Sequence, residues 1–154
     1  MPVSTSVHIS HCIQHIIAIN PSSVLDVGCG FGLWGFLCRM QLDVANGRVR
    51  PETWQARIDG IEYFEPYIQA HQRALYSSLC IGDIRELADE LEPYDLMIAG
   101  DVLEHLDKGE GEVVRDRLYA KARMALMVNI PLGAGWEHPE AYGNPQELHR
   151  SVWE

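Results

Sequence analysis

The chain has 154 residues, 47% of them hydrophobic, and a formal net charge of −10 at pH 7. This apolar content predicts one globular domain with a single core and argues against a disordered chain. The acidic balance disfavours a nucleic-acid or anionic-membrane surface, and no apolar run is long enough to span a membrane. The four cysteines form no CxxC pair and no secretory signal is expected, so we predict a reduced, cytoplasmic protein.

Helical and strand-like segments alternate along the chain. Val7 to Ile19 has apolar residues at helical spacing and stops at Asn20 and Pro21. Short β-branched or apolar runs then alternate with further helical segments. The expected strands are Val24 to Val27, Ile58 to Tyr63, Leu79 to Ile81, Tyr94 to Ala99 and Ala125 to Ile130. The expected helices are Phe31 to Leu42, Glu65 to Tyr76, Ile84 to Leu91 and much of Val102 to Arg123.

This alternation predicts an α/β fold, a Rossmann-like doubly wound parallel sheet with helices on both faces. We expect a single domain over residues 1–154, divided into an N-terminal helix (1–21), a core (22–133) and a loop-like tail (134–154). Ligands of such folds bind at the carboxyl ends of the strands. The residues that follow each strand are therefore the candidates for a binding site.

The first strand ends in the sequence VLDVGCGFG, in which Gly28 and Gly30 flank Cys29. Glycines allow close approach of a ligand to the backbone and positive φ angles. Asp26 lies just before them and would repel a phosphate, whereas it suits a ligand that carries an ammonium or sulfonium group. The alternative interpretation is a tight turn without a ligand.

Acidic residues follow the next three strands as well. Glu62 ends the second strand, where a carboxylate of a dinucleotide-binding fold accepts ribose hydroxyls. Asp83 and Asp101 follow the third and fourth strands, and both positions also suit a helix N-cap. Four acids at four neighbouring strand ends predict one shared site, although each acid alone would also be typical of a surface position or a cap.

Four segments together resemble the class I S-adenosylmethionine (SAM)-dependent methyltransferases. VLDVGCGFG is similar to the first motif of that family, IEYFEP to the second, CIGDIREL to the third and YDLMIAGDVLEHL to the fourth, in that order. The resemblance extends from about Ser22 to Gly133. It implies that SAM is the cofactor and S-adenosylhomocysteine (SAH) the product.

The resemblance also implies roles for the residues of the first two motifs. Gly28, Cys29 and Gly30 would cradle the methionine part of the cofactor. Asp26 would hold its amino group, directly or through water, and Glu62 would accept both ribose hydroxyls. NAD fits less well, because its pyrophosphate would meet Asp26 and no third glycine stands where GxGxxG requires one.

The resemblance also assigns the aromatic residues of the second motif and residues of the third and fourth motifs. Tyr63 or Phe64 would pack on the adenine, Asp83 would bind its amino group, and Ile84 would offer a backbone N–H to a ring nitrogen. Asp101 would lie near the methyl donor. These residues complete the expected cofactor site.

The expected reaction is methyl transfer to an unidentified acceptor, with a small molecule favoured. Glu104 and His105 are the candidates for a general base, because they follow Asp101 by three and four positions and a helix would present all three on one side. Two alternatives have no catalytic role, namely a SAM-binding regulatory subunit and a truncated domain without a working cofactor site.

A further alternative is a metal-assisted enzyme. Asp101, Glu104, His105 and the later His149 resemble the ExxEH…H metal ligands of small-RNA 3′-terminal 2′-O-methyltransferases. The acidic net charge opposes an RNA substrate, so we assign no metal ligand from the sequence.

Three further expectations concern the ends of the chain. His8, His11 and His15 share one helical face, which we interpret as a solvated face rather than a metal site. Trp136 and Tyr142 are candidates to line an acceptor pocket. The last segment is too short and loop-like for the antiparallel hairpin usual in the family, so the chain is either a fragment of a longer protein or a minimal version of the fold. The fifth strand would then have an open edge, which predicts a homodimer through it.

Overall fold

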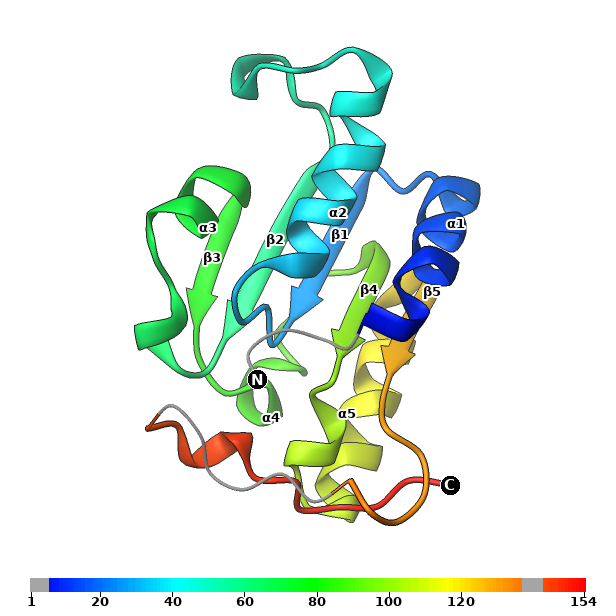
Figure 1. The fold of residues 1–154 in the computed structure, drawn as a ribbon, viewed down its shortest axis with the longest axis vertical. Coiled ribbons are helices and arrows are strands. Elements are labelled where there is room, and N and C mark those ends of the chain that lie inside the picture. The colour runs from blue at the N-terminus through cyan, green and yellow to red at the C-terminus, as the bar shows by residue number, and fades with distance from the viewer. Residues whose placement is uncertain (1–5, 137–142) are drawn as a thin grey trace.

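A computed structural model describes residues 6–136 and 143–154 of the chain. Its centre is a five-stranded parallel sheet in the order β3-β2-β1-β4-β5, which confirms the predicted fold (Figure 1). Within these residues no antiparallel hairpin follows the fifth strand. The strands are β1 (Ser23–Val27), β2 (Arg57–Glu62), β3 (Ser78–Ile81), β4 (Tyr94–Gly100) and β5 (Ala122–Asn129).

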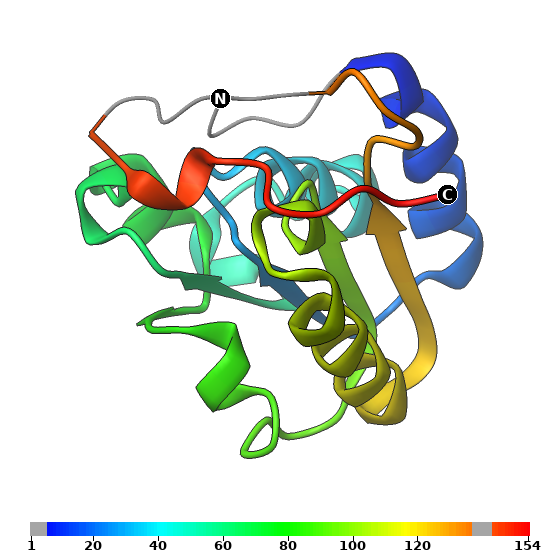
Figure 2. The same cartoon turned by 90° about the horizontal axis from the view of Figure 1, so that it is seen from below.

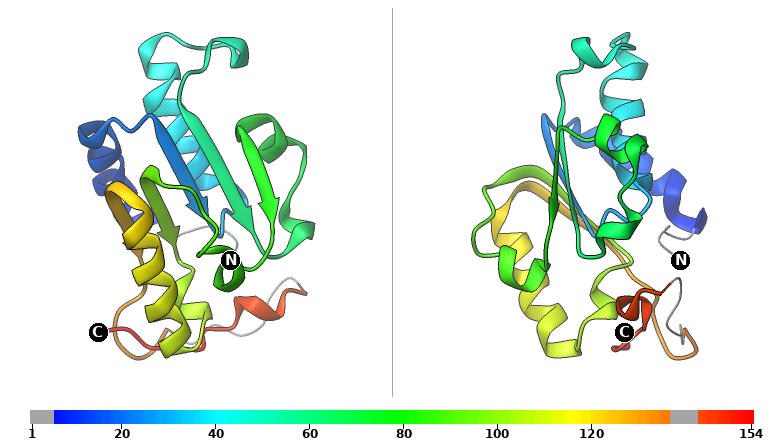
Figure 3. Two further views of the ribbon diagram at one scale, coloured as in Figure 1. Left: turned by 180° about the vertical axis from the view of Figure 1, so that it is seen from behind. Right: turned by 90° about the vertical axis from the view of Figure 1, so that its left-hand side faces the viewer.

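Helices cover both faces of the sheet (Figure 3). One face carries α1 (Ile9–Ile19), α2 (Leu33–Leu42) and α3 (Ala70–Leu75), and the other carries α4 (Ile84–Leu87) and α5 (Lys108–Lys121). In the described part of the chain no helix is both long and apolar enough to cross a membrane.

Three expected helices are shorter than predicted, and of these α4 ends at Leu87 instead of Leu91. The segment from Glu65 begins as the 3-10 turn η4 (Glu65–Tyr67), and α3 starts only after Gln69, which forms a reciprocal capping box with Gln72. The segment after β4 contains the 3-10 turn η5 (Leu103–His105) before α5 starts. Asp101 explains this break, because its φ of 54° is incompatible with an α-helix starting there.

The core has two halves, one on each face of the sheet. Alternate residues of β1 point to opposite faces, so that Val24 packs with Trp34 and Cys38 of α2, whereas Leu25 packs with Leu118 of α5. Because both faces are buried, the central strands are almost continuously apolar.

The C-terminal tail crosses the carboxyl ends of the strands (Figure 2). It is held by Trp153, which is buried, bridges Leu132 and lies beneath the ammonium of Lys108 at 3.5 Å. The backbone N–H groups of Arg150 and Ser151 donate to the carbonyl of Glu104 at 2.8 and 3.1 Å. The tail is therefore part of the wall around the strand ends.

Candidate functional site

A cavity lies at the carboxyl ends of the strands, beneath the tail. Its lining comes from the loop after β1, from the ends of β2 and β4, from the start of α4 and from the tail. The sequence-predicted residues that line it are Gly28, Cys29, Gly30, Glu62, Tyr63, Asp83, Ile84, Asp101 and His105. Asp26 and Glu104 are fully buried and do not line it.

The glycine loop has the conformation that its sequence predicts. Gly28 and Gly30 have φ angles of 65° and 50°, and a Cβ at Gly28 would come within 2.5 Å of the Val102 side chain. The N–H groups of Cys29 and Gly30 are already used, because they donate to Ile61 O and to the Glu62 carboxylate. The loop can therefore let a ligand approach its backbone closely, but these two N–H groups are not available to bind it.

Glu62 joins the second strand to the glycine loop. Its two carboxylate oxygens accept from the N–H groups of Gly30 and Phe64, both at 2.8 Å. Burial raises the pKa of Glu62, and the two backbone hydrogen bonds oppose that rise. Glu62 lines the cavity, and each carboxylate oxygen has a second lone pair that can accept a further hydrogen bond, as a pair of ligand hydroxyls would need.

Asp26 lies behind the loop rather than in the cavity. Its Oδ2 accepts from the Tyr76 hydroxyl at 2.6 Å and from the Gly35 N–H at 3.0 Å, whereas Oδ1 is buried without a partner among the described residues. Burial raises the pKa of Asp26 to about 7. These contacts fix the start of α2 and the side chain of Tyr76, and the interaction of Asp26 with a ligand ammonium stays a prediction.

Asp83 caps α4, as its position predicted, but it also has a partner that the sequence did not suggest. It accepts from the Arg85 N–H at 2.9 Å and binds the Arg85 guanidinium at 2.6 Å, which lowers the pKa of Asp83. Arg85 itself lines the cavity and reaches Glu110 at 3.2 Å. Ile84 is buried beside Asp83, and Tyr63 is half exposed at the cavity.

The end of β4 carries a strained acid and a histidine pair. Asp101 adopts a φ of 54° and its Oδ2 is buried without a partner among the described residues. Because no α-helix starts there, the expected common helical face of Asp101, Glu104 and His105 does not form: His105 lines the cavity and Glu104 points into the interior. The His105 ring meets that of His149 edge to face, with centroids 4.8 Å apart.

Burial changes the protonation of this group. The pKa of Glu104 is raised to about 8, mainly by desolvation, and the pKa of His105 is lowered, mainly by desolvation and then by the charge of His149. Glu104, His105 and His149 offer ligand atoms that all lie within 4.8 Å of one another. The structure thus brings together Glu104, His105 and His149, three of the four residues that resemble metal ligands in the sequence.

Several residues of the site carried no sequence signal. Gln72 donates to the carbonyls of Gly30 and Tyr67 and so supports the glycine loop, and Tyr67 donates to Glu147 of the tail at 2.8 Å. The capping-box spacing of Gln69 and Gln72 was the one available clue. The tail residues Asn144 and Glu147 line the cavity, but no motif announces them.

The other described candidates do not line the cavity. Trp136 is exposed and does not line it, and Tyr142 lies outside the described residues. His11 and His15 face solvent with their Nε2 atoms 3.1 Å apart, whereas the His8 ring stacks on Trp34 at 6.0 Å.

Neither a protein-family model nor a curated protein sequence matches this chain. Solved structures do. A SAM-dependent methyltransferase from Archaeoglobus fulgidus has a TM-score of 0.64 at 18% identity, with 94% of this chain and 62% of that chain covered. Magnesium protoporphyrin IX methyltransferase from Synechocystis PCC 6803 with bound SAH has a TM-score of 0.56 at 21% identity, with coverages of 78% and 52%.

A third similar structure is SAM-bound CalS10, an amino pentose methyltransferase from Micromonospora echinaspora, with a TM-score of 0.55, 18% identity and coverages of 81% and 50%. This chain spans about half to three fifths of the length of these three proteins. The chain has the fold of the class I SAM-dependent methyltransferases, which confirms the resemblance seen in its motifs.

Proposed function

We propose that the chain binds SAM in the strand-end cavity and transfers its methyl group to a small-molecule acceptor. The observation that carries this proposal is the position of Glu62, which is fixed to the glycine loop and presents acceptor capacity to the cavity. A ribose with two hydroxyl donors complements such a carboxylate.

The other lining residues fit the same ligand. Gly28 and Gly30 would leave room beside β1 for the amino-acid part, and Asp83 and Ile84, which line the same cavity, would hold the adenine. The acidic lining matches a cofactor that bears a sulfonium and no phosphate. Arg85 would have to share Asp83 with the adenine, since the two side chains are paired.

Bound SAM supplies an activated methyl group, so alignment of the acceptor can provide much of the catalysis. Asp101 and His105 line the side of the cavity next to the end of β4, where the acceptor would enter. His105 has a lowered pKa and is therefore neutral at pH 7, which suits a general base for an acceptor that keeps its proton. Glu104 does not reach the cavity and would act only through its neighbours.

The cavity wall favours a small molecule over a nucleic acid. Among the described lining residues, Arg85 is the sole arginine or lysine, and its charge is balanced by Asp83 and Glu110. A phosphate backbone requires an excess of basic groups. The metal-ligand cluster supports a metal-assisted reaction, but it does not by itself support RNA as the acceptor.

Transfer of a labelled methyl group from SAM to panels of small molecules, RNA and proteins tests this proposal. We expect incorporation into a small molecule, and its loss in His105→Ala with SAH binding preserved. SAH binding without transfer to any panel would contradict the enzyme and favour the regulatory subunit. Transfer to RNA alone would contradict the proposed acceptor class.

A further inference from the structure

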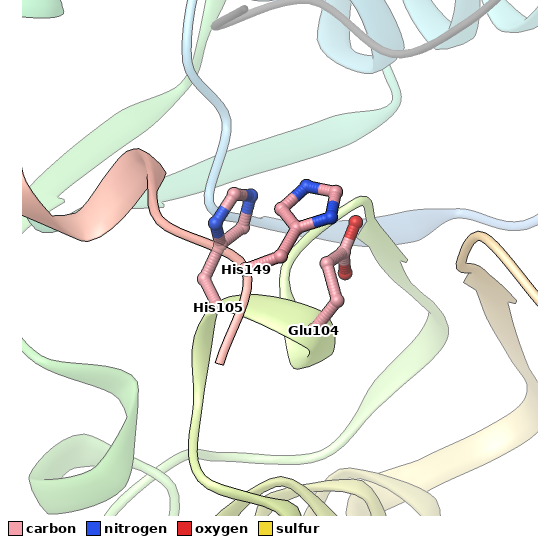
Figure 4. Close-up of side chains that lie close together, drawn as sticks. All are labelled: Glu104, His105 and His149. Atoms are coloured by element: carbon pink, nitrogen blue, oxygen red, sulfur yellow. The ribbon is translucent and has the colours of Figure 1, made fainter. Parts of the chain in front are cut away.

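Three potential metal ligands meet beside the cavity, at the end of β4. Glu104 and His105 come from η5, and His149 comes from the tail (Figure 4). Backbone hydrogen bonds from Arg150 and Ser151 to the Glu104 carbonyl hold the tail against η5 next to His149. The backbone of η5 and that of the tail therefore hold the three side chains near one another.

Glu104 is the member of this cluster that most needs a partner. Its side chain is 1% exposed, and neither carboxylate oxygen has a hydrogen-bond partner among the described residues. No ion pair to Glu104 occurs in that part of the chain either. A buried carboxyl group without a hydrogen-bond partner is costly, and buried carboxylates in proteins are normally paired with a cation or coordinate a metal.

We propose that Glu104, His105 and His149 bind one divalent transition-metal ion. Two imidazoles and one carboxylate form a ligand set that suits Zn²⁺, Mn²⁺, Fe²⁺ or Co²⁺ and leaves coordination positions open. The ligand atoms lie within 4.8 Å of one another, whereas metal–ligand bonds of about 2.1 Å bring neighbouring ligands to roughly 3 to 3.5 Å. Binding would therefore draw the three side chains together by about an ångström.

The metal site extends the proposed function, and its consequence for the acceptor rests on that function. With an ion bound, His105 is a metal ligand, and the ion takes over the activation of the acceptor that neutral His105 would otherwise provide as a base. Because His105 lines the cavity, an open coordination position would face the acceptor. An oxygen acceptor, specifically a hydroxyl, fits such a position, since a bound metal lowers the pKa of a coordinated O–H group. The hydroxyl proton would pass to solvent, the oxygen lone pair would form the new O–C bond, and the C–S bond would break with its electron pair left on sulfur.

A second pair of histidines complicates the test. His11 and His15 are exposed on α1 with Nε2 atoms 3.1 Å apart, so this pair is able to chelate a metal at the surface. Binding should therefore be measured in a His11→Gln/His15→Gln background. Cys80 is the exposed cysteine, and a thiolate ligand would reveal itself in the absorption spectrum of Co²⁺.

Titration with Co²⁺, followed by competition with Zn²⁺, measures the site by absorption and calorimetry. We expect one ion per chain, no thiolate band, and affinity that falls by at least about tenfold in Glu104→Gln and in His149→Gln, since loss of even an outer-sphere partner often costs that much. His149 is partly exposed, so His149→Gln should keep the fold, which circular dichroism would verify.

Absence of binding in the His11→Gln/His15→Gln protein, a thiolate band, or unchanged affinity in both ligand variants would overturn the metal site. SAH calorimetry on the same samples separates this failure from that of the proposed function. SAH binding without metal binding overturns the metal site alone, whereas metal binding without SAH binding overturns the proposed cofactor site.

Discussion

At the scale of single residues, the buried acids determine how the site responds to pH. Asp26 has a pKa of about 7 because it is desolvated, and the titratable groups around it are Tyr76, Glu62, Cys29 and Cys38. A raised pKa means that the folded protein holds a proton that the unfolded chain has released above about pH 4. The contribution of Asp26 to stability is therefore largest below about pH 4 and is lost as the pH rises to about 7.

Asp26→Asn should remove this dependence while keeping acceptors for Tyr76 and Gly35. We expect urea unfolding to show that the variant gains stability relative to wild type as the pH rises from about 4 to 7, by an amount on the order of a few kcal/mol. Glu52→Gln, at an exposed position, is the control. A difference between Asp26→Asn and wild type that does not change with pH would contradict the buried, protonated Asp26.

Gly28 tests the glycine loop in a similar way. Gly28→Ala places a Cβ against Val102 at a φ of 65°, so we expect a loss of about 2 kcal/mol or more in the free energy of unfolding. Gly47→Ala is the matched control, because its φ is 81° and nothing lies within 4 Å, and it should cost only about 1 kcal/mol. Val102→Ala should recover part of the loss at Gly28, and equal costs at both glycines would show that the contact is unimportant.

The residue-level predictions from sequence were strongest where backbone geometry decides the residue. Gly28 combines a positive φ with a close approach to Val102, and Glu62 ends β2, so the places of these residues were predictable from motif spacing. Arg85 was not predictable as a partner of Asp83, because a pair two residues apart forms only when the chain turns into α4. His149, which comes from the distant tail, was linked to His105 only through the metal-ligand resemblance, because nothing in the local sequence pairs the two rings.

At the scale of elements, the tail is the least anticipated part of the molecule. The sequence indicated a loop, and the structure shows that this loop closes one side of the cavity through Trp153, Glu147 and the hydrogen bonds to Glu104. Strands and helices with clear periodicity were located to within a few residues. The segment between β2 and β3 was less predictable because the reciprocal hydrogen bonds of Gln69 and Gln72, rather than periodicity, decide where α3 begins.

Tyr67→Phe tests how firmly the tail is held. It removes the 2.8 Å hydrogen bond from the Tyr67 hydroxyl to Glu147, so amide hydrogen exchange in residues 144–151 should become faster. Global stability should fall by only about 1 kcal/mol, because one hydrogen bond is lost. Tyr119→Phe, whose side chain is 73% exposed, is the control. Unchanged exchange in the tail would show that Trp153 and the backbone hold it without Tyr67.

At the scale of the whole molecule, the described part of the sheet has an unpaired edge at β5. Within the described residues β5 pairs only with β4, and Met124 on this strand is 59% exposed. Open edges invite pairing with another chain. We therefore expect a homodimer at high protein concentration by light scattering, weakened in Met124→Lys, and a monomer at every concentration would contradict it.

The central claim is that Glu62 and the glycine loop together hold SAM at the strand ends. Calorimetry with SAH tests it most directly, on wild type, on Glu62→Gln and on Glu52→Gln as the charge-matched control. We predict one SAH per chain for wild type and Glu52→Gln, and binding weakened at least about tenfold in Glu62→Gln, because an acceptor for the ribose hydroxyls is lost. Equal affinity in all three proteins, or no SAH binding to folded wild type, would contradict the account.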